Sequence, residues 1–245
     1  MTFLFAGIRP IIPNFGGHSS AYACERANDL FCSNWVSQNW STVLWPALRQ
    51  HVVLTVIAVT IGFAISSTLA LLAYRRGWVE RPVVVVTSIL YTIPSLALFE
   101  LLVGVPGLGL SRTTAEVALV SYTLLIMFRN TLTGLREVPA EVRDAAAGMG
   151  MSPMRTLLRV DVPLALPAII AGVRIATVTV ISLATVAALI DNEGLGAPIL
   201  QAISNEVFKT ELIVAGAMAI GLALVADGLL VLLQRALTPW TRAAR

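Results

Sequence analysis

The chain has 245 residues, of which 57% are hydrophobic and 13% are charged, and its mean hydropathy is +0.81. A soluble domain of this length cannot hide that much apolar surface in one core, so lipid must solvate much of the chain. The net charge of +3 is spread along the sequence, without the dense basic cluster that follows a phosphate backbone. The composition therefore indicates a membrane protein and does not favour a nucleic-acid partner.

Five segments are apolar and long enough to cross a bilayer as helices, which takes about 20 residues. They cover residues 52–74, 83–103, 115–132, 164–190 and 212–233. The third is the least apolar, and it reaches this length only with flanking Thr and Asn residues. We therefore predict an all-α integral membrane protein with about five transmembrane helices.

The distribution of arginine predicts the orientation of the chain. Three arginines follow the first predicted span, five lie between positions 129 and 159, and three lie in the C-terminal tail. The opposite side has fewer basic residues, and they are diluted by Asp191, Glu193, Glu206 and Glu211. Because cytoplasmic segments carry an excess of basic residues, we expect the N-terminus outside and the C-terminus in the cytoplasm, in agreement with an odd number of spans.

Residues 1–50 are expected to form an extracytoplasmic tail. Trp35, Trp40 and Trp45 recur in it at roughly helical spacing, and tryptophan prefers the boundary between headgroups and acyl chains. We therefore expect a helix over 34–50 that lies on the outer membrane surface and leads into the first span.

Two cysteines, Cys24 and Cys32, lie in the polar part of this tail. Outside the cytoplasm a disulfide that closes a short loop is the favoured interpretation, and two free thiols are the alternative. The cysteines lack the spacing of zinc ligands, and the histidines His18 and His51 are isolated in the sequence. No metal site is predicted.

The segment 136–167 is too polar to span lipid and too patterned for a passive loop. A helix can begin at Pro139 and a second one at Pro153, since proline suits a first helical turn. The second helix is expected to run until Pro163 and Pro167 reopen the backbone. The prediction is two short helices on the cytoplasmic face, between the third and fourth spans, shaped to dock into a groove on a partner.

Within this segment Asp144-Ala145-Ala146 is followed by Gly150 and then by Val-Asp-Val-Pro at 160–163. The pattern resembles the cytoplasmic loop of binding-protein-dependent ABC importer permeases, which reads Glu-Ala-Ala, three residues, Gly, nine residues, Ile-x-Leu-Pro. In that family the loop is the coupling helix that sits in a cleft of the ATPase subunit. The resemblance makes the following the expected ATPase-coupling residues: Asp144, Ala145, Ala146, Gly150, Val160, Val162 and Pro163.

A narrower resemblance, to quaternary-amine osmoprotectant permeases, covers most of the chain from 91 to 205. It rests on Tyr-Thr-Ile-Pro-Ser-Leu-Ala-Leu-Phe at 91–99, Phe-Arg-Asn-Thr-Leu-Thr-Gly-Leu at 128–135, Gly-Met-Gly-Met at 148–151, Pro-Leu-Ala-Leu-Pro at 163–167 and Gly-Leu-Gly-Ala-Pro-Ile at 194–199. The chain departs from the pattern twice. Ile-Ser-Ser-Thr stands at 65–68 where a Pro-Leu-Gly kink is expected, and Glu100 replaces a small or apolar residue.

Four residues of the second span are candidates for the transport pathway. Thr92, Pro94 and Ser95 are expected to kink the span and expose backbone carbonyls, which is tolerated where a cavity or a neighbouring helix receives them. Glu100 lies near the outer end of the span. It is interpreted first as a residue that reaches the headgroup region, and alternatively as a carboxylate that attracts a cationic substrate.

Two charges, Arg174 and Asp227, lie inside predicted spans at compatible depths. A charge in lipid is costly, so such residues usually face protein and pair. A structural ion pair is the favoured interpretation, and contact with the substrate is the alternative.

The resemblance implies the permease subunit of an ATP-driven importer for glycine betaine, choline or carnitine, located in the cell membrane. The expected organisation is a tail over 1–50, a transmembrane domain over 51–235 with a coupling loop at about 136–165, and a cytoplasmic tail over 236–245. The implied partners are cytoplasmic ATPase subunits, a second permease subunit (the same or a related chain) and an extracytoplasmic binding protein. The chain has no glycine-rich nucleotide loop, so we expect no cofactor here and ATP and Mg on the ATPase.

Three alternatives follow from the same residues. A permease for another small solute, such as an amino acid, is the main one. A membrane-embedded enzyme would need a clustered catalytic constellation in the spans, and an ion channel would need a filter-like string. The sequence shows neither, so the chain is not expected to be an enzyme.

Overall fold

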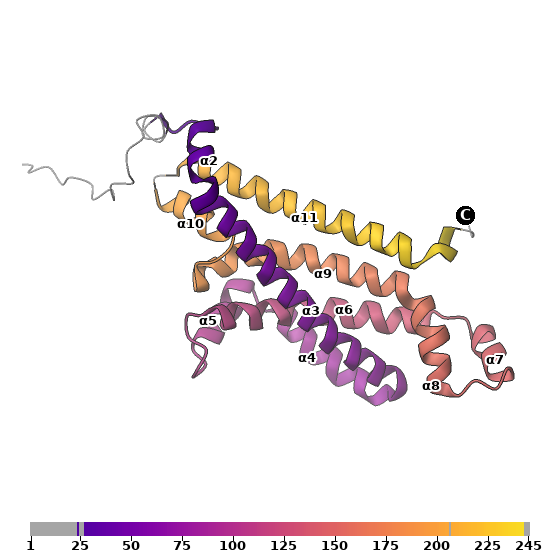
Figure 1. Cartoon of the computed structure of the whole chain (residues 1–245). Helices are drawn as coiled ribbons and strands as arrows, with labels where there is room; N and C mark the ends of the chain where they lie inside the picture. The colour runs from indigo at the N-terminus through magenta and orange to yellow at the C-terminus, as the bar shows by residue number, and fades with distance from the viewer. Residues whose placement is uncertain (1–23, 25–26, 206, 243–245) are drawn as a thin grey trace, which may run out of the picture.

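The computed structural model describes residue 24, residues 27–205 and residues 207–242, which form helices and no strand (Figure 1). His18, Glu206 and half of the predicted N-terminal tail lie outside the described residues. The elements in chain order are α2 (Ser33–Asn39), the π-helical turn η1 (Trp40–Leu44), α3 (Trp45–Arg75), η2 (Gly77–Val79), α4 (Glu80–Thr92), α5 (Ser95–Val103), α6 (Arg112–Arg136), α7 (Ala140–Gly148), α8 (Pro153–Thr156), the π-helical segment η3 (Leu157–Asp161), α9 (Val162–Asp191), α10 (Gly196–Ser204), α11 (Lys209–Leu237) and η4 (Pro239–Arg242).

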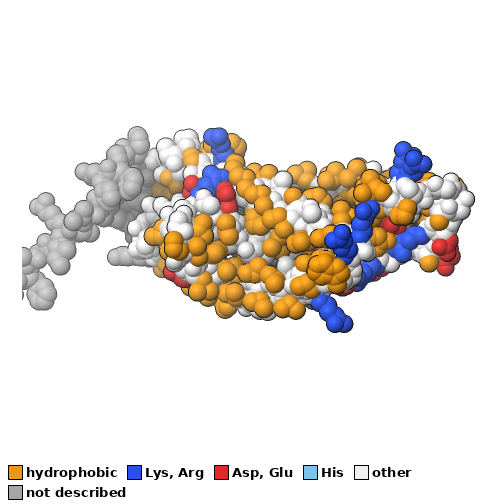
Figure 2. All heavy atoms as spheres, turned by 90° about the horizontal axis from the view of Figure 1, so that it is seen from below, with side chains coloured by type: hydrophobic (Ala, Val, Ile, Leu, Met, Phe, Trp, Pro, Cys, Tyr) orange, Lys and Arg blue, Asp and Glu red, His pale blue; other side chains and the backbone are white. Residues whose placement is uncertain are grey.

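Four helical stretches in the described part are long and apolar enough to cross a membrane, and a bent pair of shorter helices makes a fifth span if it is counted as one. The four are Ser33–Arg75, Arg112–Arg136, Pro153–Asp191 and Lys209–Leu237. In Figure 1 α6, α9 and α11 run side by side and α3 crosses them obliquely. Hydrophobic side chains cover the middle of the molecule, and charged side chains gather towards its two ends (Figure 2). The described residues thus confirm the prediction of an all-helical protein with about five spans, the fifth being the bent pair.

The second predicted span is broken at the place where the sequence predicted a kink. Its two halves, α4 and α5, are bent by 99° where a proline kink was expected. Ile93 has a ψ of 128° and Pro94 a ψ of 137°, so two successive residues are extended. The residue before a proline is disfavoured in helical backbone, and the proline has no N–H with which to continue the helix. The position of the break was predictable, but its angle was not.

The prolines at 163 and 167 do not end the preceding helix, contrary to the sequence-based prediction. Helices α8 and α9 and the segment η3 form one stretch, Pro153–Asp191. Pro163 lies in the first turn of α9, and just before it the Val162 N–H donates to the Leu157 carbonyl across a π-helical turn. A wider turn makes room for a ring that otherwise clashes with a preceding carbonyl. The second of the two predicted short helices is therefore the beginning of the fourth span.

The helix expected over 34–50 forms, but it is not a separate element. It continues without a break into the first span as one stretch of 43 residues. Such a helix is about 65 Å long, roughly twice the hydrocarbon thickness of a bilayer. Trp35 is buried edge-on against Phe208, at 5.4 Å between ring centroids, whereas Trp40 and Trp45 are exposed. Its first turns are thus attached to the start of α11.

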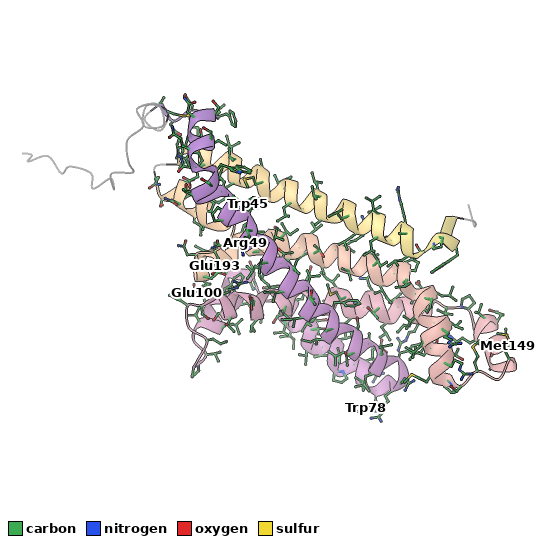
Figure 3. All side chains as sticks on the ribbon, in the orientation of Figure 1. Trp45, Arg49, Trp78, Glu100, Met149 and Glu193 are labelled. Carbon is green, nitrogen blue, oxygen red and sulfur yellow. A yellow bond between two sulfur atoms is a disulfide. The ribbon has the colours of Figure 1, made fainter. Side chains whose placement is uncertain are left out.

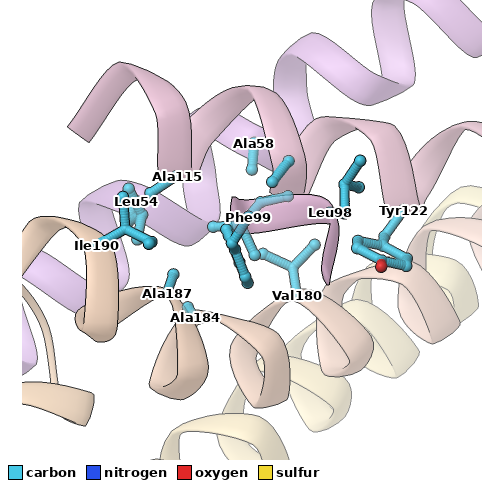
Figure 4. Packing of buried hydrophobic residues seen from close by; sticks show 12 residues of the cluster. Leu54, Ala58, Leu98, Phe99, Ala115, Tyr122, Val180, Ala184, Ala187 and Ile190 are labelled. Atoms are coloured by element: carbon cyan, nitrogen blue, oxygen red, sulfur yellow. The ribbon is translucent and has the colours of Figure 1, made fainter. Parts of the chain in front are cut away.

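The main apolar core lies where α5 meets α3, α6 and α9 (Figure 4). Phe99 is fully buried in it and Leu98 is 5% exposed. The other buried members are Leu54, Ala58, Ala115, Ala118, Leu119, Tyr122, Val180, Ala184, Ala187 and Ile190. The break before α5 therefore turns this short helix inward, so that its apolar face fills the centre of the bundle.

Helices α6 and α9 approach closely at two glycines. A Cβ added at Gly134 would lie 2.7 Å from the Ala168 Cβ, and one added at Gly172 would lie 2.6 Å from the Asn130 Cβ. Both separations are shorter than a van der Waals contact. Small residues let helix backbones pack closely in lipid, where apolar surface alone gives no driving force for association.

The structure brings together the two charges that the sequence placed inside spans. Arg174 on α9 donates through Nε and Nη2 to the two carboxylate oxygens of Asp227 on α11, at 2.8 and 2.9 Å. The side chains are 31% and 37% exposed in the isolated chain. A bidentate pair of this kind holds α11 against α9 at a fixed register.

We predict that Asp227→Leu lowers the melting temperature of the detergent-purified protein more than the double variant Arg174→Leu/Asp227→Leu does. The single variant leaves a guanidinium without its partner between apolar helices, whereas the double variant leaves no charge behind. Thermal unfolding followed by size-exclusion chromatography measures both. A double variant less stable than either single one would contradict a structural ion pair.

Candidate functional site

Helix α7 has two different faces. Asp144 and Ala145 are exposed, whereas Ala146 is 1% exposed and Arg143 is partly buried. Residues three apart lie on the same side of a helix, so Arg143 and Ala146 share the face towards α8 and η3. The predicted coupling residues in α7 are therefore divided: two face outward, where a partner can reach them, and one attaches the helix to the bundle.

Gly150 ends α7 in a conformation that suits glycine. Its φ is +79°, in the left-handed region. The Gly150 N–H donates to the Ala147 carbonyl and the Met151 N–H donates to the Ala146 carbonyl, at 2.9 and 3.1 Å. This is the hydrogen-bond pattern of a Schellman motif, which satisfies the last carbonyls of a helix. The glycine of the sequence pattern is thus required by the backbone of the turn.

The other three predicted coupling residues lie at the base of the fourth span and not in α7. Val160 belongs to η3, and Val162 and Pro163 begin α9; all three are partly buried. Val162 packs against a cluster that includes the buried Leu135 and Leu157. These three residues belong to the part of the segment that packs against the bundle, whereas Asp144 and Ala145 form its exposed surface.

The candidate pathway residues surround the break between α4 and α5. Thr92, Pro94 and Glu100 are exposed, and Ser95 is partly buried. Glu100 lies at the same end of the molecule as Arg49, opposite Met149 (Figure 3).

A tyrosine from another helix holds this break, and the sequence analysis did not identify it in that role. The Tyr122 hydroxyl on α6 donates to the Ile93 carbonyl at 2.6 Å. Its ring also packs edge-on against Tyr91, at 6.1 Å between centroids. The two bonded residues are 29 positions apart, so no local pattern signals the contact.

His51 joins the N-terminal part of α3 to the turn after α9. It is fully buried, and its Nδ1 accepts the Leu195 N–H at 3.2 Å. The proton of the neutral ring is then on Nε2, which lies 3.0 Å from the Ile181 carbonyl and donates to it. The neighbouring Gln50 side chain accepts the Gly194 N–H. The sequence predicts no role for His51, because its partners are 130 and 144 positions away.

The start of α11 is capped by a loop that precedes α2. Cys24 and Cys32 are joined in a disulfide across this loop, as the sequence favoured. The Asn28 side chain accepts the Lys209 N–H at 2.9 Å, and the Thr210 hydroxyl donates to the next backbone carbonyl of the loop at 2.8 Å. The first N–H groups of a helix have no partner within it, so this loop supplies one of the missing acceptors. Among the described residues no group of three His, Cys, Asp or Glu side chains is placed to hold a metal ion.

A bundle of long apolar helices, one of them broken, with a short helix attached at one end, is the architecture of the membrane subunit of an ABC importer. The chain matches the family described as binding-protein-dependent transport system inner membrane component over residues 58–241. It belongs to this family. It is therefore a multi-pass membrane protein and a component of a transport system rather than an enzyme.

Several known proteins are similar to the chain. It is 39% identical over 194 residues to the osmoprotectant import permease protein OsmW of Salmonella typhimurium, covering 78% of this chain and 89% of that protein. It is 35% identical over 191 residues to the choline transport system permease protein OpuBB of Bacillus subtilis, covering 78% and 86%. It is 44% identical over 137 residues to the ergothioneine transport permease/ergothioneine binding protein EgtU of Helicobacter pylori, covering 56% and 24%.

A solved structure shares the fold. The chain superimposes on a subunit of the inward-facing MetNI methionine ABC transporter with a TM-score of 0.72 and 20% identity. The match covers 80% of this chain and 97% of that one.

We predict that Gly150→Ala raises the rate of amide hydrogen exchange at the end of α7 about fivefold, because a side chain at this φ costs roughly 1 kcal/mol. Gly148→Ala is the matched control. Neither site has a neighbouring atom within 4 Å of the added Cβ, and only Gly150 has a positive φ. The control is expected to keep or slow the exchange, since alanine favours a helix. Equal exchange rates in the two variants would contradict a backbone role for Gly150.

Proposed function

We propose that this chain is the permease subunit of an ATP-driven importer for quaternary-amine osmoprotectants such as glycine betaine, choline and carnitine. The observation that carries the proposal is the coupling pattern, whose Asp144 and Ala145 are exposed on α7 at one end of a chain that belongs to the importer family. The relatives named as osmoprotectant and choline permeases match 78% of the chain and support the substrate class. Ergothioneine, named for the third relative, also carries a trimethylammonium group and is the second candidate.

The end of the molecule that carries α7 lies in the cytoplasm. Arg75, Arg136, Arg143 and Arg155 lie at or near this end, and an excess of arginine marks the cytoplasmic side. Met149 and Trp78 lie towards this end in Figure 3, and Trp45, Arg49, Glu100 and Glu193 lie towards the other. In this orientation the disulfide of the N-terminal loop is extracytoplasmic, where such bonds persist.

The exposed face of α7, formed by Asp144 and Ala145, docks into a cleft of a cytoplasmic ATPase subunit. The small alanine side chain allows close approach, and the carboxylate offers a partner for a basic group. ATP and Mg bind the ATPase, and hydrolysis of ATP moves α7 relative to the spans. The permease then alternates between outward and inward openings as rigid bodies move against one another.

A second permease subunit, either the same chain or a related one, covers part of the apolar surface. Helix α11 exposes Ile220, Leu224, Val225, Leu229 and Leu232, each by 60% or more. Exposed apolar patches of this extent mark contacts with protein or lipid. Lipid covers the remainder.

An extracytoplasmic binding protein delivers the substrate and supplies most of the selectivity. The substrate passes the break between α4 and α5, where Thr92, Pro94 and Ser95 interrupt the helix. Glu100, exposed on α5, attracts a cation by a force that salt screens. Its alternative role is that of a membrane-interface residue.

The transport proposal predicts ATP-dependent uptake of labelled choline or glycine betaine in proteoliposomes that contain this chain, its cognate ATPase and its binding protein. Unlabelled carnitine and ergothioneine are expected to compete, because a trimethylammonium group is held by cation–π contacts that the binding protein provides. Unlabelled methionine is the matched control and is not expected to compete. Uptake that methionine competes for, or that proceeds without ATP, would contradict the proposed substrate class or mechanism.

The orientation predicts the accessibility of the only two cysteines in the chain. In intact cells an impermeant maleimide is expected to label Cys24 and Cys32 only after treatment with an impermeant reductant. In a Cys24→Ser/Cys32→Ser background, Met149→Cys should be labelled only after the membrane is permeabilised, because Met149 is 71% exposed at the opposite end. The reverse pattern of labelling would invert the topology.

A further inference from the structure

The inner face of α7 is attached to the bundle by one arginine that reaches three other elements. Arg143 donates through Nε to the Asp161 carboxylate in η3 at 3.2 Å and through Nη2 to the Leu135 carbonyl at the end of α6 at 2.8 Å. Its guanidinium also lies over the ring of Tyr74 at the end of α3, 5.8 Å from the centroid. One side chain therefore connects α7 to η3, α6 and α3.

The acceptor of this arginine is a buried carboxylate. Asp161 is 3% exposed, and its second oxygen accepts the Tyr74 hydroxyl at 3.2 Å. Burying a carboxylate is unfavourable unless it is paired and hydrogen-bonded. Removing either donor therefore leaves an incompletely satisfied charge, which makes the position of Arg143 energetically important for the whole cluster.

The position of Asp161 makes it suited to transmit movement. It is the last residue of η3, directly before α9. A π-helical segment is less regularly bonded than an α-helix, and such segments are frequent at functional sites. The helix continues from there to Asp191 without a break, so a displacement of Asp161 is carried along the fourth span.

The cluster of Arg143, Asp161 and Tyr74 lies against the inner face of α7, whereas Asp144 and Ala145 form its exposed face. Arg143 is the residue before Asp144 and lies about 100° from it around the helix, on the side that faces η3. A force applied to the exposed face thus reaches the bundle through the neighbouring side chain.

We propose that Arg143 and Asp161, supported by Tyr74, form the link that transmits movement of α7 into the third and fourth predicted spans and the end of the first. The inference rests on the proposed function and adds to it the residues that carry the coupling inside this chain. They are positioning residues, because they touch neither the substrate nor ATP.

The test uses the complete complex in nanodiscs, with choline or glycine betaine as the probe. ATP hydrolysis is measured with and without loaded binding protein, and the amount of ATPase subunit that co-purifies is measured in parallel. Arg143→Gln and Asp161→Asn are each expected to lower the stimulated part of the hydrolysis by about two- to thirtyfold, which corresponds to the coupling energies of roughly 0.5–2 kcal/mol found along such networks. The ATPase subunit should still co-purify, because the Asp144 face is unchanged.

The double variant Arg143→Gln/Asp161→Asn is expected to lose no more than the worse single variant, because the two residues act as one unit. Tyr74→Phe keeps the ring beneath the guanidinium and removes one donor, so its loss should be smaller. The matched control is Arg136→Gln, which breaks an ion pair with Glu80 at the same end of the molecule. That pair is 46% and 32% exposed, and its loss should change stimulation by less than about twofold.

Single variants that are stimulated like the wild type would overturn the inference, and so would additive losses in the double variant. Loss of the ATPase subunit from the Arg143→Gln complex would also overturn it, because Arg143 would then serve docking and not transmission. A wild-type complex without substrate-stimulated hydrolysis would overturn the proposed function itself, and the inference with it.

Discussion

A backbone that crosses hydrocarbon must satisfy its own hydrogen bonds, and the structure is organised around this constraint. Regular helices meet it internally. Where the helix is interrupted, a side chain from a distant element supplies a bond: Tyr122 donates to the Ile93 carbonyl at the break in the second span, and His51 accepts the Leu195 N–H in the turn after the fourth. The irregular segments are therefore held in one geometry instead of being loose connections.

The broken span carries both the centre of the core and the candidate pathway residues. The extended backbone at Pro94 directs α5 across the bundle, where Phe99 is fully buried between α6 and α9. The opposite side of the same short helix leaves Glu100 exposed. A continuous second span would leave the centre of the bundle to be filled by other side chains. The core and the candidate pathway thus depend on the same break.

At the other end of the molecule, the continuity of α8, η3 and α9 places the beginning of the fourth span beside the short helix α7. The prolines suggested a separate short helix between α7 and the fourth span. Instead the buried Asp161 stands at the base of a single stretch that ends at Asp191, and Arg143 connects it to α7. The exposed Asp144 is left free for a partner. Attachment on one face and exposure on the other are properties of a single short helix.

The sequence alone determined the membrane class, the long spans, the position of the break at Pro94 and the glycine at the end of α7, because apolar length and turn chemistry are local properties. It also determined the family, through the spacing of the coupling pattern. Only the tertiary structure decided the 99° bend, the continuity through Pro163 and the roles of His51 and Asp161. The partners of these two side chains lie 18 to 144 positions away, and which distant groups meet is set by helix packing, which no local pattern encodes.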